Sequence, residues 1–105
     1  MTTYIRAQVG RYTFEQMQNF TSGDGGDGCD ELGGLCACRS VSALLSNTVM
    51  DALSPGDEII VFKGYEVCEI YDGYRVIPTE EILRTSKEQF LADENLRDSI
   101  DEMLW

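Results

Sequence analysis

Hydrophobic and polar positions alternate along this chain with two different periods, and the changes of period divide it into elements. Residues 2–9 carry β-forming side chains and are followed by a glycine, which predicts a strand. In residues 14–20, Phe14 and Met17 recur at the spacing of one helix face. Residues 35–38 again favour a short strand, whose alternate side chains point to the same face.

A longer helix is predicted after this strand. Ser40 is suited to be its N-cap, because a serine hydroxyl can accept from the first free backbone N–H groups of a helix. Apolar residues then recur on one stripe as far as Leu53, and the sequence Ser-Pro-Gly-Asp at 54–57 ends the helix.

The period changes to that of strands in residues 58–77. An Asp-Gly pair between apolar segments is typical of a hairpin turn, since both turn residues need a positive φ. The pattern predicts an antiparallel meander of three strands, 58–63, 65–71 and 73–77, with turns at Gly64 and at Asp72-Gly73.

These elements indicate an α+β fold in a single domain spanning residues 1–105. An antiparallel β-sheet, made of the meander at about 58–77 and the N-terminal strand, is expected to pack with two or three α-helices. The chain has 105 residues and 43% hydrophobic content, which suffices for one core. Residues 21–34 hold six of the ten glycines and form a Gly/Asp-rich loop.

An acidic helix is predicted at the end of the chain. Ser86 and Gln89 have the spacing of a capping box, which starts a helix over residues 86–104. One side of this helix is apolar, and the other is a candidate surface for binding a partner. The acidic residues of that side are Asp93, Glu94, Asp98, Asp101 and Glu102.

The chain as a whole is strongly acidic. Nineteen acidic and eight basic residues give a formal net charge of -11, which disfavours direct binding to nucleic acid or to an anionic membrane. Such a protein suits a basic surface on another protein. No secretory signal or membrane-spanning run is evident in the sequence, so we expect a cytosolic protein.

Four cysteines are the other distinctive feature, and histidine is absent. A zinc site would therefore consist of thiolates, and four of them satisfy the tetrahedral preference of a structural zinc. We predict such a site from Cys29, Cys36, Cys38 and Cys68. Two alternatives remain open: reduced cysteines that only fill space, and a disulfide or redox pair within the set.

A calcium site is a further alternative for the glycine-rich loop. Residues 25–32 match the first eight positions of one copy of a nonapeptide typical of calcium-binding β-rolls, with Asp24, Asp27 and Asp30 as oxygen donors. A single copy does not complete the cage of ligands that successive copies share. A solvated, turn-rich loop is the simpler interpretation.

The sequence contains no motif that indicates catalysis. It has neither a Gly-x-Ser-x-Gly nucleophile motif nor a phosphate-binding loop ending in Gly-Lys-Ser or Gly-Lys-Thr. Cys36-Ala-Cys38 also lacks the usual spacing of a redox pair. We therefore expect a protein that is not an enzyme.

In its overall profile the chain resembles the small acidic phage proteins that inhibit CRISPR nucleases, the anti-CRISPR proteins. The resemblance rests on size, α+β pattern, negative charge and the cysteine set, and on no single motif. It implies a non-enzymatic inhibitor in the bacterial host cytosol, with a structural zinc and no direct contact to nucleic acid. Its protein partner would be a CRISPR effector nuclease, whose positively charged channel holds guide and target.

A second hypothesis is that the protein binds a small anionic ligand. A phage counter-defence protein could sequester or use a nucleotide signal. Such a ligand needs a local basic pocket, because arginine binds phosphate in bidentate fashion. The residues available for it are Arg6, Arg11, Arg39 and Arg75.

Overall fold

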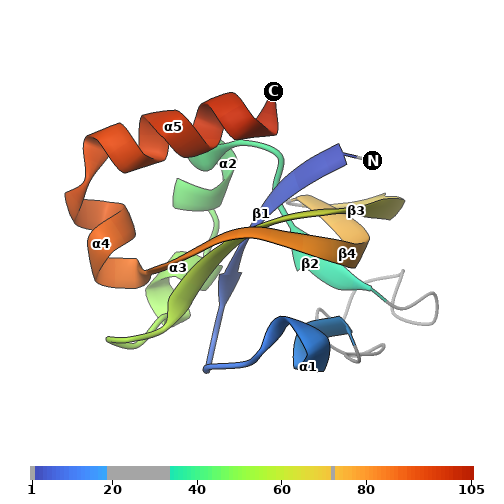
Figure 1. Ribbon diagram of the computed structural model, residues 1–105, viewed down its shortest axis with the longest axis horizontal. Coiled ribbons are helices and arrows are strands. Elements are labelled where there is room, and N and C mark those ends of the chain that lie inside the picture. The colour runs from blue at the N-terminus through green and yellow to red at the C-terminus, as the bar shows by residue number, and fades with distance from the viewer. Residues whose placement is uncertain (1, 19–33, 72) are drawn as a thin grey trace.

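The computed structural model of the protein describes residues 2–18, 34–71 and 73–105 (Figure 1). This part contains a four-stranded antiparallel sheet with helices on both faces, which confirms the predicted α+β fold. The strand order is β1-β3-β4-β2. The strands are β1 (Thr2–Gln8), β2 (Leu35–Ala37), β3 (Glu58–Ile70) and β4 (Gly73–Ser86).

The prediction of a three-stranded meander is wrong, because β3 and β4 form one long hairpin that pairs from Glu58 with Ser86 to Ile70 with Gly73. Gly64 is not a turn and lies inside β3. A Cβ atom at Gly64 would stand 2.5 Å from the carbonyl oxygen of Ile77 in β4, so the glycine is needed for close approach of the strands. The reversal predicted near Asp72-Gly73 is confirmed by the pairing of Ile70 with Gly73.

The hairpin is irregular, and the sheet curls. Its register shifts between Val61 and Phe62, and again on either side of Tyr65, and such irregularities bend and twist strands. As a result β2, at one end of the strand order, meets β1 at the other. Ile5 N donates to Cys38 O at 2.9 Å, and Cys38 N donates to Ile5 O at 2.8 Å.

Each face of the curled sheet covers its own hydrophobic cluster. On one face, buried side chains of β1 and β3 pack with four helices, and Ile5, Ile59 and Val61 contribute from the sheet. Figure 1 shows α2 and α5 on this side of the sheet and α1 on the other. The second cluster includes Tyr4, Phe62, Leu35, Val76 and Met17.

The helix predicted over residues 41–53 is interrupted. Ser40 is the N-cap as predicted, since its Oγ accepts from Ala43 N at 3.0 Å. The helix α2 (Val41–Leu45) then ends, and α3 (Val49–Ala52) follows. Asn47 Oδ1 accepts from Val49 N at 2.9 Å, which satisfies the start of α3 and competes with a continuous helix.

The acidic helix predicted over residues 86–104 is also two helices, α4 (Lys87–Ala92) and α5 (Glu94–Leu104). Ser86 starts α4 as predicted, with Oγ accepting from Gln89 N at 3.1 Å. Asp93 between the helices has an extended backbone, with φ -112° and ψ 96°, and this breaks the helical path. No helix in the described part of the chain has both the length and the apolar character needed to cross a membrane.

On the opposite face, α1 (Phe14–Gln18) covers the second cluster. Thr13 and Gln16 cap its start reciprocally: Gln16 N donates to Thr13 Oγ1 at 3.1 Å, and Thr13 N donates to Gln16 Oε1 at 2.8 Å. The predicted helix 14–20 is confirmed as far as Gln18. Residues 21–33 of the predicted Gly/Asp-rich loop, with the candidate calcium ligands, lie outside the described residues.

Candidate functional site

The predicted acidic surface divides into two groups of residues. Glu94, Asp98 and Glu102 are exposed and recur at intervals of four residues, so they form one row along α5. We call these three residues the α5 acidic row. Four residues rise about 6 Å along a helix, so the row is about 12 Å long. Ile100 and Leu104 on the other side of α5 are buried in the hydrophobic cluster that contains Ile5, Ile59 and Val61 of the sheet.

The other two predicted residues, Asp93 and Asp101, have structural roles. Asp93 Oδ1 accepts from Leu96 N at 3.0 Å and caps α5, while its Oδ2 accepts from Gln89 Nε2 at 3.1 Å. Asp101 Oδ1 accepts from Val41 N at 3.2 Å and so ties α5 to the start of α2. These carboxylates hold the helices in place, and only the α5 acidic row faces outward without such contacts to the described residues.

Several cations of the protein are directed inward. Arg97, the one basic residue of α5, donates through Nη1 to the carbonyls of Phe90 and Leu91, both at 2.6 Å. Lys87 Nζ donates to Leu53 O at 3.0 Å. Arg6 and Arg75 are buried. These four positive charges therefore contact the protein's own backbone or interior, while the α5 acidic row faces solvent.

The cysteines occupy different environments. Cys38 is 3% exposed and belongs to the same hydrophobic cluster as Ile5, Ile59 and Val61, whereas Cys36 is partly exposed, and neither forms a disulfide bond. Cys36 in β2 and Cys38 just after it are on the same face, as predicted, because the alternate residues Leu35 and Ala37 pack in the second cluster. Cys68 in β3 belongs to a disulfide bond.

The four-cysteine zinc site stays a prediction, since Cys29 lies outside the described residues. Cys36 and Cys68 are brought into one row of the sheet, as each pairs in register with Arg75 of β4. Among the described residues, no group of three or more cysteine, histidine or acidic side chains is arranged to hold a metal ion. A disulfide sulfur is not a thiolate ligand, so the zinc prediction applies to the reduced chain.

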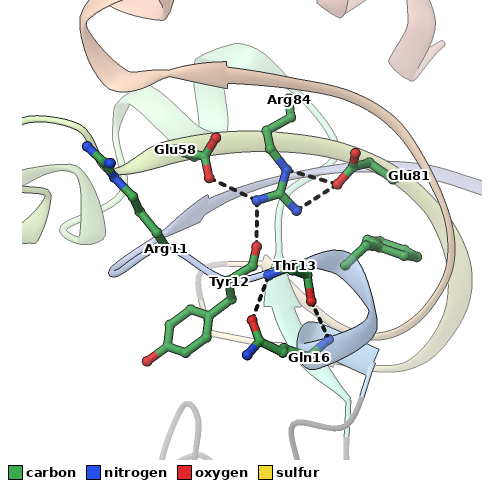
Figure 2. Close-up of a pocket in the computed structure, with 8 residues that line it drawn as sticks. Arg11, Tyr12, Thr13, Gln16, Glu58, Glu81 and Arg84 are labelled. Carbon is green, nitrogen blue, oxygen red and sulfur yellow. Dashed lines mark hydrogen bonds and ion pairs between the residues drawn. The ribbon is translucent and has the colours of Figure 1, made fainter.

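The sequence did not indicate the pocket of about 480 Å³ between the start of α1 and the hairpin (Figure 2). Its central group is the Arg84 guanidinium, which Figure 2 shows between the two carboxylates of Glu58 and Glu81. Arg84 Nη1 donates to Glu58 Oε1 at 2.9 Å, and Nε and Nη2 donate to Glu81 Oε1 at 2.9 and 2.6 Å. Nη1 also donates to Tyr12 O at 2.6 Å and so holds the chain that leads into α1.

The electrostatics of this pocket favour a structural role for Arg84. Burial of the guanidinium alone would lower the pKa of Arg84, but hydrogen bonds to Glu81 and Glu58 outweigh it and raise the pKa above its ordinary value. The N–H groups of the guanidinium are directed to carboxylates, a carbonyl and the Met17 sulfur. Arg84 is therefore a poor anion site.

The arginines that a nucleotide site would need have separate contacts. Arg6 donates to Gln8 Oε1 and Cys36 O at 2.8 and 2.7 Å, and the Arg39 guanidinium lies 5.5 Å from the centre of the Tyr74 ring. Arg75 is fully buried in β4. Of the four predicted arginines, Arg11 alone lines the pocket described above, and its Nε donates to Gly56 O at 3.1 Å.

Comparison with known proteins gives no relative for this chain: no protein-family model, curated protein or solved structure matches it.

Proposed function

We propose that this protein is a non-enzymatic inhibitor whose acidic surface binds a basic, nucleic-acid-handling surface of a CRISPR effector nuclease and blocks loading of the target DNA. The observation that supports this best is the α5 acidic row, Glu94, Asp98 and Glu102, exposed on a helix whose other side is anchored in the core. The net charge of -11 also supports binding to a basic surface. The partner class comes from the resemblance in size and charge to anti-CRISPR proteins.

The α5 acidic row lowers the stability of its own helix. Like charges four residues apart destabilise a helix by about 0.2–0.5 kcal/mol per pair. The row contains two such pairs, Glu94 with Asp98 and Asp98 with Glu102. The one cation of α5, Arg97, is bound at the end of α4. A row of this kind is suited to a partner that supplies the missing positive charges.

Binding of this kind would exclude nucleic acid by occupation of its site. Lysine and arginine side chains that normally hold phosphates would bind the carboxylates instead, so no base is read and no bond is broken. Complementary charge also steers the encounter and makes the association rate sensitive to salt.

The proposal is tested with purified CRISPR effector–guide complexes. Binding is measured by surface-based kinetics over a series of salt concentrations, and DNA loading is measured in parallel. The change is Glu94→Lys, Asp98→Lys and Glu102→Lys together. At about 1 kcal/mol for each reversed exposed charge, the triple variant should bind at least about a hundredfold more weakly.

The matched control reverses three exposed carboxylates on other elements, Asp51, Glu69 and Glu80, and so changes the net charge equally. We expect the control to retain most of its affinity, because the interaction is local to α5. Equal loss in both variants would show that only net charge matters. Binding that is insensitive to salt and to both variants would contradict the proposal.

A structural zinc is part of the same proposal. In the reduced protein it would tie Cys36 of β2 and Cys68 of β3 to the other two cysteines, with no open position for chemistry. The test is metal quantitation on reduced protein purified without chelator. A reduced, folded protein without metal would contradict the zinc, while leaving the α5 interaction to be decided by the binding assay.

A further inference from the structure

Trp105, the only tryptophan of the chain, lies at the surface at the end of α5. It is 87% exposed and belongs to neither of the two hydrophobic clusters of the described residues. Tryptophan is among the residues most enriched at the centres of protein interfaces, where it fills a pocket of the partner. The fold makes no use of the Trp105 ring in its core and leaves the ring accessible to a partner.

Helical spacing places Trp105 in line with the α5 acidic row. It follows Glu102 by three residues and Asp98 by seven, which is close to two turns. At about 100° per residue, Trp105 lies about 20° from Asp98 around the helix axis and about 60° from Glu102. Along the axis it stands about 4.5 Å beyond Glu102. Trp105 therefore extends the α5 acidic row by one position.

The C-terminal end of α5, marked C in Figure 1, itself attracts positive charge. A helix carries about half a negative elementary charge there, because its last carbonyl groups have no donors within the helix. The last turn of α5 contains no basic residue to offset this charge. A cation from outside would therefore meet the Glu102 carboxylate, a helix C-terminus and the ring of Trp105 within one turn.

The carboxylates beside Trp105 select among the ligands that an exposed tryptophan can bind. A tryptophan can stack on the bases of single-stranded nucleic acid or enter a membrane interface, but Glu102 and Asp98 would repel the phosphates of both. A second copy of this chain would bring another net charge of -11 to the same surface. A basic protein surface has the opposite charge and fits these residues.

Arginine suits this surface better than lysine. A guanidinium is planar, so it can lie flat on an indole ring while the N–H groups at its edge donate to a carboxylate. A lysine ammonium is a strongly hydrated point charge that stacks less well. The protein contains a contact of the same kind, since the Arg39 guanidinium lies 5.5 Å from the centre of the Tyr74 ring.

We infer that Trp105 is the anchor of the α5 binding surface and stacks on an arginine side chain of a basic partner protein, with Glu102 binding the same guanidinium. This inference deepens the proposed function, since it rests on the α5 acidic row as the binding surface. It specifies the chemistry of the partner: an exposed arginine on a surface that normally holds phosphate.

The test is calorimetric titration of the full chain at low salt with two capped peptides, one of eight arginines and one of eight lysines. The peptides carry equal charge, so the ratio of their dissociation constants measures the preference for guanidinium. An exposed cation–π contact contributes about two- to fivefold in affinity, so Trp105→Leu should reduce this preference about two- to fivefold. Trp105→Phe should retain part of it. In the wild type, the fluorescence of the single tryptophan should change as the arginine peptide binds.

The matched control is Tyr71→Leu, which removes another fully exposed aromatic ring, next to the hairpin turn, without changing the net charge. We expect this variant to keep the full preference for arginine. An unchanged ratio in Trp105→Leu, an equal loss in Tyr71→Leu, or tryptophan fluorescence that does not change at saturation would overturn the inference. The titrations contain no nuclease, so they decide the role of Trp105 separately from the CRISPR partner, which the charge-reversal assay decides.

Discussion

Replacement of Arg84 by methionine tests whether the cation in the pocket holds α1 and the hairpin together. Methionine keeps much of the apolar stem and removes the charge. The side chains of Arg84, Glu58 and Glu81 are 20%, 25% and 35% exposed, so the two ion pairs lie between the fully exposed and the buried limits. We take about 1 kcal/mol for each pair, at the upper end for exposed pairs, and about 1 kcal/mol for the lost hydrogen bond to Tyr12 O.

The expected loss is therefore about 3 kcal/mol in the free energy of unfolding. In a domain of this size it corresponds to a decrease in Tm of about 15 °C. The measurement is urea unfolding followed by circular dichroism at low salt and at about 1 M salt, where the Debye length falls to about 3 Å. The difference between wild type and variant should shrink at high salt, because the ion pairs are partly exposed to solvent.

The control is Arg97→Met, because Arg97 Nη1 donates to the backbone carbonyls of Phe90 and Leu91. Its loss should be about 1–2 kcal/mol and nearly independent of salt. Double-mutant cycles of Arg84→Met with Glu58→Gln and with Glu81→Gln should give coupling energies of about 1 kcal/mol each. A loss below about 0.5 kcal/mol for Arg84→Met would refute the inference that Arg84 holds α1 and the hairpin together.

Three further changes test the fold. Asp57→Ala should lower the free energy of unfolding, measured with urea, by about 2 kcal/mol, because Asp57 accepts from Gly10 N and Ser54 N at 3.2 and 2.9 Å. Asp57→Asn should lower it less, and equal losses in the two variants would argue against the importance of these backbone contacts. Gly64→Ala should lower the free energy of unfolding by about 2 kcal/mol, since the added Cβ would stand 2.5 Å from Ile77 O. An unchanged midpoint of urea unfolding would contradict the close approach of β3 to β4 at this residue. Burial, and then the hydrogen bond to Glu66, raise the pKa of Tyr4 above 10.0, so the unfolded chain ionises first and stability should fall as the pH rises above about 10. Tyr4→Phe should flatten that part of the stability profile, and an unchanged slope would rule Tyr4 out as its source.

Local pattern by itself determined where two of the helices begin and where the hairpin reverses. Ser40 and Ser86 cap helices where the sequence places them, and the chain reverses near Asp72-Gly73. These features depend on a few neighbouring residues, because a cap or a turn is a matter of local hydrogen bonds and backbone angles. The alternation of apolar residues likewise indicated an α+β fold.

Long-range contacts decided what the local pattern left open. Gly64 resembles a turn residue in the sequence, but the approach of β4 makes it the place where two strands touch. Asp93 and Asp101 resemble the other acidic residues of the last segment, but their contacts with Leu96 N and Val41 N make them structural. Nothing in the sequence indicated the structural role of Arg84, because its partners Glu58 and Tyr12 come from distant segments.

The sequence by itself therefore determined the class of fold, the acidic character and the list of cysteines. Only the tertiary structure decided which carboxylates face solvent, and that Cys36 and Cys68 stand on either side of Arg75. The physical reason is that charge and composition belong to residues one at a time, whereas exposure and pairing depend on which strands the curled sheet brings together.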